Sequence, residues 1–171
     1  TLLTFFFFFS MRHHDLKVFF FDRHRGAEIF TRSIGGAYIG FEGDEKNVSL
    51  NPFDCENNAN NRAFLRRWMR AITLVDDAIS EKEIARAVTT AFDYLRPSER
   101  LMTNLYKSCF SPTGNMRREL FKWVNPDQYG KIFNGDTDSL DLKAKRFMAF
   151  DFTHIFEDET LAPAVISYIM H

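Results

Sequence analysis

The residues best placed to do chemistry follow the apolar run Val18–Phe21: the carboxylate of Asp22, the guanidinium of Arg25, and Gly26. A continuous apolar run that ends at polar turn residues is typical of a strand buried on both faces. In an open α/β sheet, ligands bind just beyond the carboxyl ends of such strands. There the Asp22 carboxylate can meet a ribose hydroxyl, a metal-bound water or a basic side chain. Taken by itself, the segment favours the simpler interpretation of a strand end capped by a solvated charge cluster.

A second segment of the same kind lies near the other end of the chain. Arg146–Phe152 is apolar apart from its first residue and the acid Asp151. The predicted order of elements is helix, strand, hairpin, helical block, strand, helix. Strands that alternate with helices imply a mainly parallel sheet. We therefore predict an α/β fold in which residues 1–58 and 134–171 form a core and residues 59–133 form an all-helical insertion.

The insertion is predicted from its three-and-four spacing of apolar residues, which indicates a first helix over about residues 61–76. A second helix is expected to begin at the capping box Ser80–Glu83 and to end before Pro97. Two shorter helices are expected around Leu105 and Leu120. The four arginines of the first helix occupy its remaining face, which favours a solvated surface over a nucleic-acid patch: Arg62, Arg66, Arg67 and Arg70.

The segments outside the insertion are less regular. Leu2–Phe9 predicts a buried helix, with a buried strand as the alternative, and it is far shorter than the about 20 residues of a membrane span. The Gly35–Gly36 turn is followed by alternating apolar positions, which indicates a β-hairpin that returns through Val48–Leu50. Residues 159–171 predict an amphipathic helix. The absence of an initial methionine leads us to expect a piece of a longer protein.

Composition argues against several classes of site. The formal net charge is −1, from 22 basic and 23 acidic residues, which favours neither nucleic acid nor an anionic membrane as a partner. Cys55 and Cys109 lack metal-ligand spacing, and the histidines His13–His14 have no suitably spaced partner. The acids of residues 136–141 lack the glycine and glutamate of a calcium loop. No metal site is predicted.

Six short stretches arrive in one order along the chain: Thr1–Phe5, Val18–Gly26, Gly35–Tyr38, Leu50–Phe53, Gln128–Phe133 and Phe150–Thr153. Each stretch is weak alone. Their order and spacing together resemble the nucleotide-binding domain of the type IV secretion and conjugation ATPases, the VirB/TrbE/CagE class related to TraC. The resemblance covers essentially the whole chain.

The resemblance implies a P-loop (RecA-like) core that uses ATP and Mg²⁺. In that family, the stretch that resembles Thr1–Phe5 follows directly on the phosphate-binding loop, and the acid that holds Mg²⁺ lies on a later strand. We therefore expect an incomplete domain that does not hydrolyse ATP by itself, whereas the intact protein does. Asp22 and Arg25 match the family's second-strand segment and are the candidate cofactor-binding residues; no catalytic residue is identified. His24 stands where that segment commonly carries an acid.

The function that the resemblance implies is a motor ATPase that energises substrate transfer through a type IV secretion or conjugation system. Such a motor works as a homo-oligomeric ring, such as a hexamer, on the cytoplasmic side of the bacterial inner membrane. Its partners are other secretion-system subunits, and secreted protein or DNA is its indirect substrate. Two alternatives stay open: a non-catalytic scaffold whose helical insertion is a docking surface, and a nucleic-acid translocase of the same superfamily.

Overall fold

The computed structural model describes residues 2–13, 15–41 and 48–171, and the chain divides into two compact units. The sheet unit comprises Thr1–Val48 and Leu140–Glu159. The helical unit comprises Ser49–Ser139 and Thr160–His171. The predicted core of residues 1–58 and 134–171 differs from the sheet unit at its edges, and that division into domains stays a prediction.

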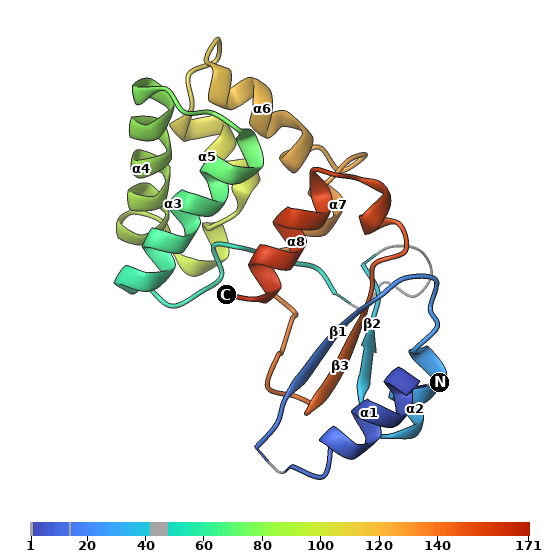
Figure 1. Ribbon diagram of the computed structural model, residues 1–171. Coiled ribbons are helices and arrows are strands. Elements are labelled where there is room, and N and C mark those ends of the chain that lie inside the picture. The colour runs from blue at the N-terminus through green and yellow to red at the C-terminus, as the bar shows by residue number, and fades with distance from the viewer. Residues whose placement is uncertain (1, 14, 42–47) are drawn as a thin grey trace. The chain divides into compact units, whose positions relative to one another are not determined.

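The sheet contains three described strands, β1 (Val18–Asp22), β2 (Ala37–Ile39) and β3 (Phe147–Asp151), in the order β1-β3-β2 (Figure 1). Both pairings are parallel, and the register places Asp22 opposite Asp151. The two apolar strands that the sequence predicts are therefore neighbours in one sheet, although the helical block separates them along the chain. The predicted α/β class with a parallel sheet is confirmed.

Two helices cover one face of this sheet, α1 (Leu2–Ser10) and α2 (Glu28–Ser33), as Figure 1 shows. Phe7 of α1 packs edge-on against Phe147 at 5.4 Å, and Phe30 of α2 packs against the same ring at 5.7 Å. Aromatic rings fill the opposite face of the sheet: Phe19, Phe21, Phe41, Phe150 and Phe152. Much of the phenylalanine in this chain therefore packs on the two faces of one short sheet.

The prediction of a helix at the start of the chain is right, but the prediction that it is buried is wrong. Four of its phenylalanines are between 39% and 63% exposed: Phe5, Phe6, Phe8 and Phe9. Of its five phenylalanines, which the structure describes, Phe7 is the one that packs against the buried cluster of Tyr38, Phe147 and Ala149. β1 is also half-buried rather than buried on both faces, because β3 is the central one of the three described strands.

The predicted β-hairpin is wrong. β2 pairs in parallel with β3, and Val48–Leu50 forms no strand. The predicted tip, residues 42–47, lies outside the described residues. The turn before β2 instead passes close to the backbones of α2 and β3. A Cβ at Gly36 would lie 2.8 Å from the carbonyl oxygen of Phe147 and 3.0 Å from that of Thr31, so a glycine is needed there.

The helical unit contains the helices that the periodicity predicts: α3 (Ala59–Thr73), α4 (Ala78–Asp93), α5 (Met102–Cys109), α6 (Asn115–Val124) and α8 (Leu161–Ile169). It also contains the short α7 (Gly130–Phe133), where no helix is predicted. Single 3₁₀ turns occur at Pro97–Glu99 and, in the sheet unit, at Ile155–Glu157. Two buried tryptophans anchor the core: the indole N–H of Trp68 donates to the Ala164 carbonyl at 3.1 Å, and that of Trp123 to Ile72 at 3.2 Å.

The predicted capping box at Ser80 is wrong, because α4 begins three residues earlier. The Asp77 side chain accepts the backbone N–H groups of Ile79 and Ser80 and caps the helix. Ser80 and Glu83 are buried within α4, where Glu83 accepts the backbone N–H of Ser111 at 3.0 Å. Glu83 thus ties the connection between α5 and α6 to α4 rather than capping α4.

Among the described residues, no helix combines the length and apolar character needed to cross a bilayer.

Candidate functional site

The candidate site lies at the carboxyl edge of the sheet, where β1 and β3 end side by side. Asp22 is the last residue of β1 and only 4% exposed. Its Oδ2 accepts the backbone N–H of Ala27 at 2.8 Å and the phenol of Tyr38 at 3.0 Å. Tyr38 belongs to β2 and reaches Asp22 across the small side chain of Ala149. Asp22 therefore closes the loop after β1 and connects the two outer strands across β3.

Burial and the neighbouring acid also set the ionisation of Tyr38. Its pKa is raised above the ordinary value, chiefly by burial, then by the hydrogen bond to Asp22 and the charges of Asp22 and Asp151. The phenol therefore stays protonated at neutral pH and remains a hydrogen-bond donor to the carboxylate.

The loop after β1 is fastened to the end of β3. The backbone N–H of His24 donates to the hydroxyl of Thr153 at 3.0 Å, and that hydroxyl donates to Asp151 at 2.6 Å. The loop carries two consecutive residues in the left-handed region, His24 at φ 67° and Arg25 at φ 57°. Each costs about 1 kcal/mol in a residue with a side chain. The contacts of Asp22 and Thr153 hold the loop in that conformation.

Arg25 is a partly exposed charged group of the site, with its side chain 41% exposed. Its guanidinium donates twice to Glu28 Oε2, at 3.0 and 2.7 Å, and lies 3.9 Å from Asp151. The hydrogen bonds from Arg25 and then from Arg32 lower the pKa of Glu28. The guanidinium is thus oriented by carboxylates and stays partly exposed.

The space at this edge is small. Phe41, Asp151, His154 and Ile155 line a cavity of about 20 Å³, which is room for roughly one water molecule. In the described part of the chain, no three His, Cys, Asp or Glu side chains are grouped so that they could hold a metal ion. The described residues offer a cation, carboxylates and a hydroxyl at a sheet edge.

Both predicted site residues, Asp22 and Arg25, therefore lie at the same edge, with different surroundings. Asp22 is buried and bonded to the protein, whereas Arg25 is partly open. Sequence reasoning missed the contributions of Tyr38, Thr153 and Glu28. A threonine two residues after a strand-ending aspartate is a signal for a side-chain-closed turn, and could have identified Thr153.

The chain is similar to proteins of type IV secretion systems. It is 27% identical over 168 residues to the type IV secretion system protein virB4 of Bartonella henselae, a match that covers 95% of this chain and 21% of the relative. It is 28% identical over 167 residues to protein virB4 of Rhizobium radiobacter, with the same coverage. Its identity to the type IV secretion system protein PtlC of Bordetella pertussis is 25%, over 91% of this chain. The chain spans about a fifth of the length of these curated relatives.

The fold is similar to that of VirB4 of Thermoanaerobacter pseudethanolicus, with a TM-score of 0.69 over 94% of this chain and 50% of that one, at 15% identity. No model of a known protein family matches the chain. The resemblance that the six stretches predict is confirmed by the VirB4 relatives, which align with nearly the whole chain.

Proposed function

We propose that this chain is part of the nucleotide-binding domain of a motor ATPase that energises transfer through a type IV secretion or conjugation system. The observation that carries the proposal is the parallel pairing of β1 with β3 in register at Asp22 and Asp151, with the helices inserted between them. It is supported by similarity to virB4 and PtlC proteins, whose names place them in type IV secretion systems.

Within the intact protein, ATP supplies a phosphoryl group that Mg²⁺ and the phosphate loop make reactive. The 171 residues contain no G-x-x-x-x-G-K-[ST] loop. The chain's own contribution is therefore the sheet edge. Arg25 is oriented toward solvent by Glu28, and a guanidinium pairs well with the oxygens of a phosphate. Asp22 holds the loop in place by accepting hydrogen bonds from the backbone N–H of Ala27 and the phenol of Tyr38.

The proposal extends to the surroundings of the intact protein. The motor acts as a homo-oligomeric ring together with other secretion-system subunits, on the cytoplasmic side of the bacterial inner membrane, and its indirect substrate is secreted protein or DNA. The similarity to secretion-system proteins supports this assignment.

ATP hydrolysis tests the proposal. We expect no turnover by the 171-residue chain, and turnover by the longer natural protein that contains it. Arg25→Gln in the longer protein is expected to lower kcat/KM about tenfold, and Arg66→Gln, on the solvent face of α3, is the matched control. Turnover by the 171 residues alone would contradict the proposal, and a longer protein without turnover would favour the scaffold.

A further inference from the structure

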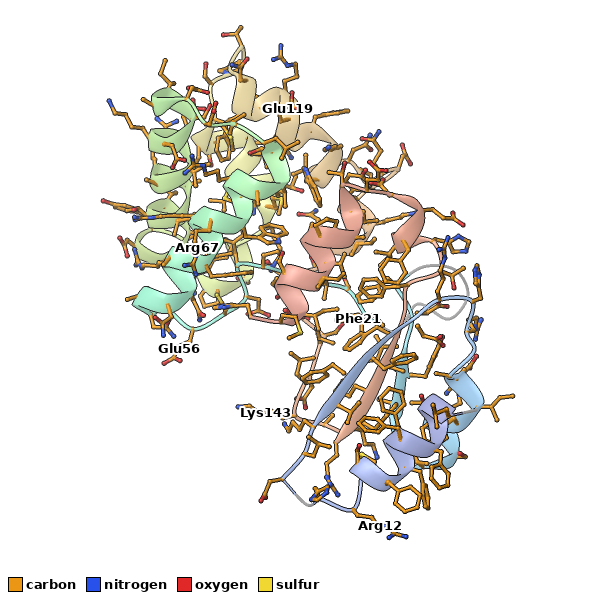
Figure 2. The ribbon with its side chains drawn as sticks, viewed as in Figure 1. Arg12, Phe21, Glu56, Arg67, Glu119 and Lys143 are labelled. Atoms are coloured by element: carbon orange, nitrogen blue, oxygen red, sulfur yellow. The ribbon has the colours of Figure 1, made fainter. Side chains whose placement is uncertain are left out.

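Thr153 joins the loop after β1 to the end of β3. The backbones of the two strands are hydrogen-bonded as far as Asp22, whose carbonyl accepts the N–H of Phe152 at 2.9 Å. Beyond that point, the Thr153 hydroxyl accepts the backbone N–H of His24 at 3.0 Å. Figure 2 labels Phe21, the residue of β1 before Asp22, which marks this end of the strand. The side chain of Thr153 therefore continues the connection between the strands into the loop.

The same hydroxyl orients the carboxylate of Asp151. It donates to Asp151 Oδ1 at 2.6 Å, and the backbone N–H of Thr153 donates to the same oxygen at 3.0 Å. Two donors on one oxygen fix the orientation of the carboxylate. The other oxygen, Oδ2, lies 3.9 Å from Nε of Arg25. Thr153 thus holds Asp151 with one oxygen toward the guanidinium.

The backbone at Arg25 needs support from outside the loop. His24 and Arg25 are both in the left-handed region, at φ 67° and 57°, which residues with a Cβ disfavour. The loop is held on either side of them, by the bond from the N–H of His24 to Thr153 and by that from the N–H of Ala27 to Asp22. Arg25 lies between these two fixed points. A loop released at His24 would relax, and the Arg25 side chain would change direction with it.

Glu28 is a close partner of Arg25, but it belongs to the same segment of the chain. Its Oε2 accepts hydrogen bonds from Arg25 at 3.0 and 2.7 Å, from a position three residues further on. A pair so close in sequence shapes the loop and α2 locally, and it moves with them. The contacts with Thr153 and Asp151 reach the end of β3 instead, so they determine where the guanidinium lies relative to the sheet.

We propose that Thr153 is a positioning residue of the nucleotide edge, whose hydroxyl holds the Arg25 guanidinium where it pairs with a phosphate oxygen of the nucleotide. The proposal rests on the proposed function, in which Arg25 is the chain's cation at that edge. Thr153 touches no reacting atom. It acts on Arg25 along two routes, through the backbone at His24 and through the carboxylate of Asp151.

ATPase kinetics of the proposed intact protein test this role. Thr153→Val and Thr153→Ala both remove the hydroxyl, and each is expected to lower kcat/KM about fivefold. The loss is divided between kcat and KM in the same proportion as in Arg25→Gln, because all three changes act on one guanidinium. Thr153→Ser keeps the hydroxyl and stays within about twofold of the wild type. Urea unfolding checks that each variant is folded under the assay conditions.

A double-mutant cycle separates positioning from a purely structural role. In the Arg25→Gln background, Thr153→Val is expected to cause no further loss of kcat/KM, since the group that it positions is already gone. Thr73→Val is the matched control. Thr73 is a buried threonine of α3 whose hydroxyl donates to the Met69 carbonyl at 2.7 Å, and its substitution leaves kcat/KM at the wild-type value.

The failure of this proposal can be told from the failure of the proposed function. An intact protein without ATP turnover overturns both. Turnover that Arg25→Gln lowers, but that Thr153→Val and Thr153→Ala leave unchanged, overturns the positioning role alone. So does a loss of about fivefold on Thr153→Val in both backgrounds, because independent sites add. So does a Thr153→Ser variant as slow as Thr153→Val.

Discussion

The buried carboxylate of Asp22 offers the sharpest test of how the sheet edge is held together. Asp22→Ala removes the acceptor of two groups, the backbone N–H of Ala27 and the phenol of Tyr38. Tyr38 is only 6% exposed, so its phenol has little access to water in compensation. A buried polar group left without a partner costs about 1–3 kcal/mol. We therefore expect Asp22→Ala to lower the free energy of unfolding by about 2–5 kcal/mol.

Asp22→Asn separates the charge of this side chain from its shape. Both hydrogen bonds go to the same oxygen, Oδ2, so an amide oxygen at that position can still accept both. Only the charge assistance is lost, and the expected cost is about 1 kcal/mol. Tyr38→Phe has a similar expected cost. In a double-mutant cycle, Asp22→Asn and Tyr38→Phe are expected to couple by about 0.5–1 kcal/mol, since the first weakens and the second removes the same hydrogen bond.

The assay has to report on the sheet unit. Both tryptophans, Trp68 and Trp123, lie in the helical unit, so their fluorescence follows that unit. Hydrogen exchange of the β1 and β3 amides across a urea series reports on the sheet, whereas far-UV circular dichroism mainly follows the helices of the helical unit. If Asp22→Ala changes the free energy of unfolding by less than about 0.5 kcal/mol, or if the cycle shows no coupling, the reasoning about this edge is refuted.

Three further substitutions test neighbouring features by urea unfolding. Glu28→Gln is expected to cost less than about 1 kcal/mol at pH 7. Because the folded-state pKa of Glu28 is lowered, that cost is present above the unfolded-state pKa and fades as the pH falls through the folded-state value; a cost independent of pH would contradict the ion-pair assignment. Gly36→Ala is expected to cost about 1–3 kcal/mol, because its Cβ would meet a backbone carbonyl oxygen of β3 at 2.8 Å. The matched control, Gly35→Ala, has φ 74° and no atom within 4 Å, and costs about 1 kcal/mol; equal costs would argue against the close approach. Thr153→Val removes the hydroxyl that accepts the backbone N–H after β1 and is expected to cost about 1 kcal/mol, with faster hydrogen exchange of that amide; unchanged exchange there would contradict the contact.

The strand pair could be predicted from sequence because β1 and β3 carry the same signature, an apolar run that ends at an acid. Asp22 and Asp151 are directly opposite in the register, so that signature also marks the same edge of the sheet. The helices of the helical unit were predictable for a different reason. Their apolar spacing is local, and leucines such as Leu65, Leu105 and Leu120 are fully buried as that spacing requires.

The failed predictions concern choices that local pattern does not decide. The Gly35–Gly36 turn is compatible with a hairpin, but the pairing of β2 with β3 involves residues more than a hundred positions apart. Two candidate capping residues, Asp77 and Ser80, lie three positions apart at the start of α4, and Asp77 caps the helix because its carboxylate accepts the backbone N–H groups of both Ile79 and Ser80. An apolar helix was expected to be buried, whereas α1 exposes most of its rings.

The candidate site was only half predictable. The position of Asp22 and Arg25 at the sheet edge follows from the end of the strand. The hydrogen bond between Asp22 and Tyr38 could not be predicted, because it depends on the strand order. The phenol of Tyr38 contacts Asp22 because β3 lies between β1 and β2, and because the β3 residue opposite Tyr38 is the small Ala149. The different burial of Asp22 and Arg25 likewise could not be predicted, because it depends on how the loop after β1 packs.

Hydrogen exchange of the proposed intact protein, with and without a non-hydrolysable ATP analogue, tests whether the carboxyl edge of β1 and β3 faces the nucleotide. We expect slower exchange on nucleotide binding at residues 22–27 and 151–154, and no change in α4 or α6. Nucleotide binding that leaves both strand ends unchanged would contradict the claim.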